Sequence, residues 1–253
     1  MILNAFNLEG KVAMVTGCNT GLGQGMALGL AQAGCDIIGV NRSVASETAQ
    51  KVTATGRRFI SITADLADSH SLDAVMAQAL DASPQLDILV NNAGIIRRAD
   101  ALEFSERDWD DVMNVNSKTL FFLSQAVARQ FVQQGQGGKI INIASMLSYQ
   151  GGIRVPSYTA SKSAVMGLTR LMANEWAQYG INVNAIAPGY MATNNTEQLR
   201  DDEERNQQIL ERIPAGRWGS GEDMMGPVVF LASAASDYIN GFTLAVDGGW
   251  LAR

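Results

Sequence analysis

Apolar strand-like runs alternate with helix-like runs along nearly all of the 253 residues. The strand-like runs are rich in Val, Ile and Leu, as in Ile-Leu-Val at 88–90 and Ile-Ile-Asn-Ile at 140–143, which is typical of strands buried on both faces. A strand, a helix and a further strand in this order form a right-handed crossover within a parallel sheet. The alternation therefore predicts an α/β fold, a doubly wound parallel sheet of about seven strands with helices on both faces.

The expected strands and helices follow one another without a linker between them. No internal repeat or low-complexity segment interrupts the pattern, and a polar insertion rich in Asn, Gln, Glu and Arg occupies 194–212. We therefore expect residues 1–253 to form a single domain. We expect strands at 11–16, 36–41, 58–64, 86–91, 139–144, 182–187 and 242–246, and helices at 22–33, 46–55, 71–82, 107–133, 157–179 and 221–233.

The composition argues against several classes of protein. Hydrophobic residues make up 47% of the chain and charged residues 17%, which is ample for a large core and argues against disorder. The net charge of −6 and the lack of a Lys/Arg cluster argue against a nucleic-acid partner. No run of about 18 predominantly apolar residues occurs, and residues 1–10 lack the features of a signal peptide, so we expect no membrane role.

Cysteine and histidine are too few for a disulfide framework or an obvious metal site. Cys18 and Cys35 are the only cysteines, and we expect both to be reduced in a cytoplasmic protein. His70 is the only histidine, and its Ala/Asp/Ser-rich surroundings predict a surface residue. We therefore expect no bound metal and no Ser-His-acid hydrolase site.

The stretch from Ser145 to Lys162 follows an apolar strand and leads into a helix that we expect to begin near Pro156. Tyr158 and Lys162 are four residues apart and therefore share one face of that helix. An ammonium near a phenol favours the phenolate, which moves the pKa of Tyr158 toward the range where a general acid or base works best. Ser145 adds a hydroxyl that can donate to a carbonyl oxygen or accept from an alcohol. The alternative is a solvated Tyr–Lys pair on a helix surface.

A glycine-rich turn separates the first expected strand from the first expected helix. Its spacing is Gly-x3-Gly-x-Gly, formed by Gly17, Gly21 and Gly23. Glycines at this place let the backbone approach a phosphate, and the helix N-terminus offers amides and a partial positive charge to a dinucleotide pyrophosphate. The alternative is a tight strand-to-helix turn with no ligand.

The glycine turn, Asn91-Asn92-Ala93-Gly94, Ser145, Tyr158 and Lys162 together resemble the short-chain dehydrogenase/reductase family. The motifs fall in the family's order and spacing over essentially the whole chain. The resemblance implies a Rossmann-like fold, with residues 1–253 as one dinucleotide-binding and catalytic domain and a substrate lid near 190–215. It also implies that Tyr158 is the acid/base, that Ser145 stabilises the reacting carbonyl, and that Lys162 contacts the nicotinamide ribose. Asn116 would be the fourth catalytic residue, holding a water that links Lys162 to solvent.

The same resemblance assigns cofactor contacts at the carboxyl ends of the expected strands. At the second strand the signals conflict, because Asn41 could bind the adenosine ribose while Arg42 could either receive a 2′-phosphate or be a solvated charge. Asp65 would contact adenine or simply cap a helix, and Pro188-Gly189 would border the nicotinamide or simply form a turn. The expected cofactor residues are Gly17, Asn19, Thr20, Gly21, Leu22, Gly23, Asn41, Arg42, Asp65, Leu66, Asn92, Ala93, Gly94, Tyr158, Lys162, Pro188, Gly189 and Thr193.

Segments 91–98, 143–158, 187–196 and 213–219 are similar to the bacterial 2-dehydro-3-deoxy-D-gluconate 5-dehydrogenases of pectin and hexuronate breakdown. This similarity implies a keto-deoxy sugar acid as substrate and NAD(H) as the cofactor, with NADP(H) as the alternative. Two other functions stay open. One is a 3-oxoacyl carrier-protein reductase that uses NADPH, and the other is a dinucleotide-sensing protein without catalysis.

An anionic substrate needs a cation to compensate for its lost hydration, and the planar guanidinium group suits a carboxylate best. We expect Arg154 to bind the substrate carboxylate, with Arg97 and Arg98 as alternatives and Ser145 and Gln150 as further substrate residues. Family members are mostly homotetramers. We expect the same here, through apolar residues on the helices at 107–133 and 157–179, namely Leu120, Phe121, Phe122, Leu168, Leu171, Met172 and Trp176.

Overall fold

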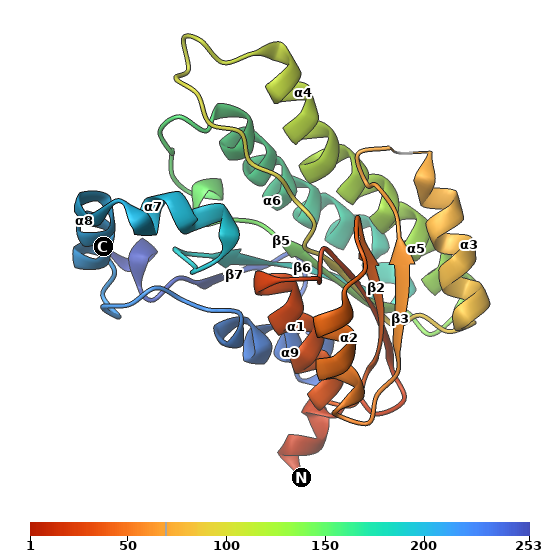
Figure 1. The fold of residues 1–253 in the computed structure, drawn as a ribbon. Helices are drawn as coiled ribbons and strands as arrows, with labels where there is room; N and C mark the ends of the chain where they lie inside the picture. The colour runs from red at the N-terminus through yellow and green to blue at the C-terminus, as the bar shows by residue number, and fades with distance from the viewer. Residues whose placement is uncertain (69) are drawn as a thin grey trace.

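The computed structural model describes residues 1–68 and 70–253. Seven parallel strands form one sheet in the order β3-β2-β1-β4-β5-β6-β7 (Figure 1). The order reverses between β1 and β4, which places the switch point at the centre of the sheet. The strands are β1 (Val12–Thr16), β2 (Asp36–Asn41), β3 (Phe59–Thr63), β4 (Ile88–Asn91), β5 (Gly138–Ile143), β6 (Ile181–Pro188) and β7 (Thr243–Val246).

Helices cover both faces of the sheet (Figure 1). Helices α1, α2 and α9 lie on one face, and α3, α5 and α6 lie on the other. The predicted α/β fold with a doubly wound parallel sheet is therefore confirmed. The helices are α1 (Gly21–Gln32), α2 (Ser46–Thr53), α3 (Ser71–Ala82), α4 (Glu106–Met113), α5 (Leu120–Gln134), α6 (Pro156–Trp176), α7 (Glu197–Asp201), α8 (Glu203–Arg212) and α9 (Met225–Ala232).

Alternation along the strands divides the core between the two faces. In β1, Met14 packs into the core beneath α3, α5 and α6, whereas Ala13 and Val15 pack into the core beneath α1 and α9. All five residues of β1 are buried, as a sheet covered on both sides requires. This explains why the strands read as continuous apolar runs in the sequence.

The expected helix at 107–133 is interrupted. Residues Asn114–Thr119 form a π-helical segment between α4 and α5, so one extra residue is inserted into the helical path at this point. The segment contains Asn116, which is fully buried. Because of the extra residue, the polar side chain of Asn116 faces the interior, whereas the period of a regular α-helix would place it on another face.

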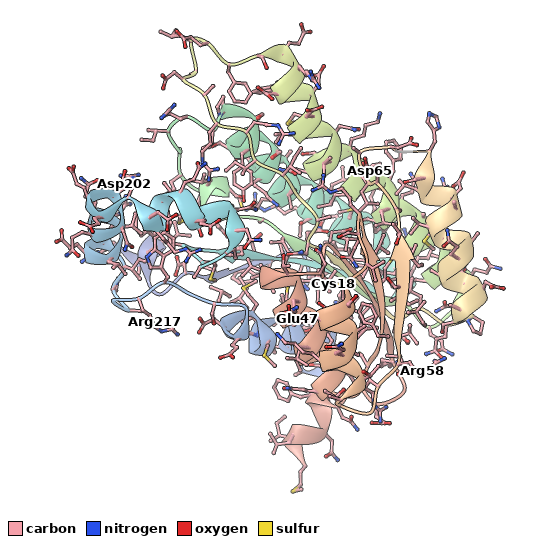
Figure 2. The ribbon with its side chains drawn as sticks, viewed as in Figure 1. Cys18, Glu47, Arg58, Asp65, Asp202 and Arg217 are labelled. Atoms are coloured by element: carbon pink, nitrogen blue, oxygen red, sulfur yellow. The ribbon has the colours of Figure 1, made fainter. Side chains whose placement is uncertain are left out.

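The polar insertion folds into two short helices, α7 and α8, which lie beside the end of β7 and the C-terminus (Figure 1). Figure 2 labels Asp202 at the start of α8, where its carboxylate accepts a hydrogen bond from the Arg205 amide at 3.0 Å. Across the described ranges 1–68 and 70–253, no helix is long and apolar enough to span a bilayer. The same ranges contain no group of three or more His, Cys, Asp or Glu side chains placed to hold a metal ion.

Candidate active site

The glycine turn after β1 adopts backbone angles that favour glycine. Gly17 has φ of 65° and Gly21 has φ of 58°, both in the left-handed region. Gly23 has no room for a side chain, because a Cβ there would overlap the carbonyl oxygen of Gly17 and lie 2.5 Å from Asn92 Nδ2. Each of the three glycines is therefore required by the path of the chain.

Helix α1 begins at this turn with open backbone amides. Thr20 is its N-cap, and the Thr20 side chain makes no capping hydrogen bond to the first amides of the helix. Unsatisfied amides and the positive end of the helix dipole are suited to an anion. Leu22, in the first turn of the helix, packs against the core beneath α1.

Asn41, at the end of β2, supports the glycine turn. Its side chain is 3% exposed, its Oδ1 accepts from the Cys18 amide at 2.7 Å, and its Nδ2 lies 3.5 Å from Cys18 Sγ. The opposite side of the turn is held by Thr48, whose hydroxyl donates to the Cys18 carbonyl at 2.7 Å. Both polar ends of the Asn41 carboxamide therefore face Cys18, and the expected ribose contact stays a prediction. Cys18 itself is labelled at this turn in Figure 2.

Arg42 and its neighbours form an open polar surface beyond β2. Arg42 is exposed and makes no hydrogen bond or ion pair within residues 1–68 and 70–253. Asn19 Nδ2 donates to Ser43 Oγ at 3.3 Å, so the turn after β1 and the end of β2 meet here. No carboxylate stands at positions 41–44 to repel an additional phosphate.

Thr16, a residue that the sequence did not single out, joins the two central strand ends. Its hydroxyl accepts from the amides of Asn92 at 3.0 Å and Ala93 at 2.9 Å. Asn92 Nδ2 in turn donates to the carbonyls of Thr16 at 3.0 Å and Gly17 at 2.8 Å. The Asn92 side chain therefore fixes the glycine turn to the end of β4, and a threonine at the end of a first strand is the signal that could have indicated this contact.

Two residues after β3 have different surroundings. Asp65 is exposed, and its Oδ1 accepts from the Ala67 amide at 3.0 Å, in keeping with a turn-forming aspartate (Figure 2). Leu66 is 7% exposed, and its carbonyl accepts from the Thr119 hydroxyl at 2.7 Å. This contact ties the end of β3 to the π-helical segment.

Asn116 and Lys162 meet beside Gly94. A Cβ on Gly94 would lie 3.2 Å from Asn116 Oδ1 and 3.7 Å from Lys162 Nζ. Asn116 Oδ1 accepts from the Ile95 amide at 2.8 Å, while Nδ2 donates to the Ile95 carbonyl at 2.9 Å and to Ser161 Oγ at 3.1 Å. The amide of Asn116 is therefore fixed by the backbone after β4 and by α6.

Ser145 follows β5 and is held against α6. Ser148 Oγ donates to the Lys162 carbonyl at 2.6 Å and accepts from the Ser145 amide at 3.3 Å. The Ser145 hydroxyl accepts from the Leu147 amide at 3.1 Å and lies near the Tyr158 phenol. The structure thus brings Asn116, Ser145, Tyr158 and Lys162 together from three separate parts of the chain.

Burial shifts the pKa values of Tyr158 and Lys162 in opposite directions. It raises the pKa of the Tyr158 phenol above its usual value, and the Ser145 hydroxyl and the Arg98 charge oppose this rise. Burial also lowers the pKa of Lys162 to about 8, since the side chain is only 4% exposed. Lys162 Nζ lies 5.7 Å from the Tyr158 ring centroid and donates to the Ile143 carbonyl at 2.6 Å. The expected acidification of Tyr158 by Lys162 is not found, because desolvation dominates and the ammonium is directed at a carbonyl.

The three expected arginines have different partners. Arg154 Nε lies 3.2 Å from Asp100 Oδ1, and the guanidinium of Arg97 lies 3.4 Å from Asp108 and 3.6 Å from Asp111. Arg98 has no carboxylate within ion-pair distance among the residues that the structure describes. Its Nη2 donates to the Asn195 carbonyl at 2.9 Å, and its charge lowers the pKa of Tyr158. Arg98 is therefore the one of the three that has no carboxylate partner among the described residues and whose charge acts on Tyr158, and the expected role of Arg154 stays a prediction.

The loop after β6 lies next to the glycine turn. Pro188 ends β6, and the Gly189 amide donates to the Val246 carbonyl at 3.0 Å. Thr193 lies next to the glycine turn, with its methyl group 3.5 Å from the position of a Cβ on Gly21. The glycine turn and the start of the insertion therefore lie side by side at the carboxyl ends of the strands.

The arrangement matches a known family. The profile described as short chain dehydrogenase matches residues 11–204. The chain belongs to the short-chain dehydrogenase family. The predicted resemblance and the prediction of an oxidoreductase are thereby confirmed.

Individual short-chain dehydrogenases resemble the chain over its full length. A 2-dehydro-3-deoxy-D-gluconate 5-dehydrogenase of Escherichia coli K12 is 72% identical over 253 residues, which is 100% of both chains. A crystal structure described as a 2-deoxy-D-gluconate 3-dehydrogenase of Agrobacterium tumefaciens with bound NADP has a TM-score of 0.94 and 58% identity, covering 99% of this chain and 100% of that one. A gluconate 5-dehydrogenase of Burkholderia cenocepacia in complex with NADP and tartrate has a TM-score of 0.94 and 40% identity, covering 100% of both.

The dinucleotide of the short-chain dehydrogenases fits the residues present. The uncapped N-terminus of α1 and the glycines at 17, 21 and 23 provide amides and space for a pyrophosphate. The small residues Ala93 and Gly94 leave the backbone after β4 accessible.

Proposed function

We propose that the chain is an NAD(P)(H)-dependent dehydrogenase that interconverts a ketone and a secondary alcohol on a keto-deoxy sugar acid. The substrate pair is 2-dehydro-3-deoxy-D-gluconate and 2,5-diketo-3-deoxygluconate, in pectin or hexuronate breakdown. The observation that carries this proposal is Arg98, a guanidinium without a carboxylate partner in the described structure, placed where its charge acts on Tyr158. The 72% identity to the Escherichia coli enzyme supports the choice of sugar acid.

The proposed chemistry is a proton transfer coordinated with a hydride transfer. The nicotinamide, when bound, accepts or supplies the hydride. In the oxidation direction Tyr158 accepts the proton of the substrate hydroxyl, and the Ser145 hydroxyl donates to the carbonyl oxygen that forms. In the reduction direction Tyr158 donates that proton, which its raised pKa favours at neutral pH.

Lys162 and Asn116 support this proton transfer in the proposal. Lys162, with a pKa of about 8, can change protonation near the working pH, and it would hold the nicotinamide ribose. The Asn116 carboxamide is fixed by three hydrogen bonds, so it can orient a water between Lys162 and the solvent. The proton on Tyr158 would return to solvent by this route.

Arg98 is proposed to bind the substrate carboxylate. A planar guanidinium can form two parallel hydrogen bonds with a carboxylate, which a lysine cannot do. The tartrate in the Burkholderia cenocepacia structure is a dicarboxylate found in a related enzyme, in keeping with an acid-binding site. Gln150 and Ser145 would complete the substrate contacts from the opposite side of the cleft.

For the cofactor, we propose that the site accepts both NAD(H) and NADP(H). The expectation of NAD(H) came from resemblance, whereas Arg42 is exposed, makes no ion pair within residues 1–68 and 70–253, and two related structures contain NADP. Arg42→Met should raise the KM for NADPH by about tenfold, the loss of one charge-assisted contact, and leave the KM for NADH within about twofold. Equal effects on both cofactors would contradict a role for Arg42 at the 2′-phosphate.

A two-way screen of the purified protein tests the proposed function. NAD(H) and NADP(H) are each combined with 2-dehydro-3-deoxy-D-gluconate, with D-gluconate and with an acetoacetyl thioester, and nicotinamide absorbance is followed. We expect the highest kcat/KM for the keto-deoxy acid. Preference for the thioester would favour a carrier-protein reductase, and cofactor binding without turnover would favour a dinucleotide sensor.

We also propose a homotetramer and a cytoplasmic location. Among the residues expected at the interface, Phe122 is 43% exposed on α5 and Leu171 is 44% exposed on α6, whereas Leu120 and Met172 belong to the core. The exposed pair supports association of these helices between subunits, and a monomeric mass by light scattering would contradict it. Both cysteines are free and buried, in keeping with a reducing compartment.

A further inference from the structure

The insertion after β6 is anchored by a small apolar cluster separate from the two main cores. Its buried members come from three parts of the chain, and partly buried aromatic rings complete it. Tyr190 packs edge to face on two tryptophans, with ring centroids 5.3 Å from Trp218 and 4.7 Å from Trp250. The buried members are Met146, Ile209, Ile213 and Trp250.

The C-terminal residues hold the end of α8 directly. The guanidinium of Arg212 lies over the ring of Trp250, 4.0 Å from its centroid. Arg253 donates to two carbonyls at the end of α8, from Nη2 to Glu211 O at 2.6 Å and from Nε to Arg212 O at 3.1 Å. These carbonyls belong to the last turn of the helix, where no backbone amide within the helix remains to satisfy them. Arg253 therefore caps α8 with a charged side chain from the chain end, which lies beside α8 in Figure 1.

The same insertion contacts the residues proposed to bind substrate. Arg212 Nη2 donates to Gln150 Oε1 at 3.4 Å, and Arg98 Nη2 donates to the Asn195 carbonyl at the start of the insertion. Met146, in the apolar cluster, is adjacent to Ser145. Movement of α8 away from the C-terminus would therefore disturb substrate contacts on both sides of the cleft.

We infer that the last four residues of the chain, Trp250–Arg253, form a latch that holds α8 over the substrate. Trp250 and Arg253 are thus positioning residues, which act on the substrate through Arg212 and the insertion. The inference rests on the proposed function, because the insertion is a substrate lid only if the cleft binds the sugar acid. Without the latch, the binding-competent position of α8 is less populated, and the apparent affinity for substrate falls by the same factor.

Two variants test the latch. Arg253→Ala removes both caps on α8, and Trp250→Leu removes the stacking on Arg212 while keeping an apolar side chain. Trp250 Nε1 has no hydrogen-bond partner in the described part of the chain, so this change breaks no hydrogen bond there. Arg58→Ala is the matched control, since Arg58 pairs with the exposed end of β2 through Asp36 at 2.7 Å, away from the lid (Figure 2).

We expect each latch variant to raise the KM for the keto-deoxy acid by about five- to twentyfold, with the Kd for NADPH and the kcat within about threefold of wild type. Trypsin should also cut after Arg205 and Arg212 several times faster in both variants, and Arg253→Ala should leave the melting temperature of the protein unchanged. The control Arg58→Ala should alter neither the KM for the keto-deoxy acid nor the rate of tryptic cleavage. If KM and tryptic cleavage of Arg253→Ala both stay within about twofold of wild type, the latch is refuted.

The two proposals can fail separately. If the wild-type enzyme does not turn over a sugar acid, the proposed function fails. The tryptic measurement then still decides whether the C-terminus holds α8. If Trp250→Leu does not fold, Arg253→Ala decides alone, because Arg253 is an exposed residue at the end of the chain.

Discussion

Replacing Arg98 by methionine separates the role of this arginine from those of its two neighbours. Arg154 is 63% exposed in its side chain and paired with Asp100, and Arg97 is paired with Asp108 and Asp111. Of the three, Arg98 is the one whose guanidinium has no carboxylate partner among the described residues. Its charge also lowers the pKa of Tyr158. Arg98→Met keeps an unbranched apolar stem and removes the charge and the donors of the side chain.

The magnitude follows from one charge-assisted contact. A hydrogen bond to a charged group contributes about 1.5–3 kcal/mol, so KM for the keto-deoxy acid should rise by about 10- to 100-fold. The Arg98 charge also lowers the pKa of Tyr158, and its loss raises that pKa further. Since oxidation needs the deprotonated phenol, the alkaline rise of the oxidation rate should move to higher pH in the variant.

Steady-state kinetics in both directions from about pH 6 to pH 10 measure both effects. Arg154→Met and Arg97→Met are the controls, and each should leave KM within about threefold of wild type because its guanidinium already has a carboxylate partner. A larger effect of Arg154→Met than of Arg98→Met would refute the assignment. Unchanged KM in all three variants would show that the substrate is held elsewhere or is not an acid.

Three further changes test the architecture of the site. Gly23→Ala should weaken NADPH binding at least tenfold and destabilise the fold by about 1–3 kcal/mol, because the methyl group would overlap Gly17 O. Gly167→Ala is the control, because a Cβ there would meet open space, and it should change neither NADPH binding nor stability. A fluorescence titration with NADPH measures the binding of both variants. Ser148→Ala should lower kcat by about tenfold with KM little changed, because it frees the Ser145 loop from the Lys162 carbonyl; an unaltered kcat would contradict this. In the folded protein the pKa of Lys162 is lowered from 10.5 to about 8, which means that folding disfavours its charged form. Between pH 10.5 and pH 8 the unfolded chain therefore binds more protons than the folded protein, and the free energy of unfolding falls as the pH falls through this range. In chemical unfolding, wild type should therefore gain stability relative to Lys162→Met as pH rises from 8 to 10.5, and a constant difference would refute the shift.

The sheet and the site motifs could be predicted because short-range patterns determine them. Continuous apolar runs are typical of strands buried on both faces, and the carboxyl ends of parallel strands meet at one edge. Tyr158 and Lys162 share a helix face by their spacing alone, and the helix begins at Pro156 as expected. These features depend on neighbours in the sequence.

The remaining features depend on contacts between distant residues. The π-helical segment around Asn116 differs from an α-helix by one residue in a single turn, which periodicity cannot resolve. The role of Asn41 depends on which way its carboxamide points, and the sequence does not determine this. Arg98 could be separated from Arg154 only after the fold had placed Asp100 beside the latter.

The measurement that tests the account most directly is the turnover of Tyr158→Phe in the reduction of 2,5-diketo-3-deoxygluconate by NADPH. The change removes the phenolic hydroxyl and leaves the ring, so the Kd for NADPH should stay within about threefold of wild type while kcat falls by about 10²- to 10⁴-fold. A variant that binds NADPH normally and has lost turnover is the predicted result. Retention of more than about a tenth of the wild-type kcat would contradict the assignment of Tyr158 as the acid and base of this enzyme.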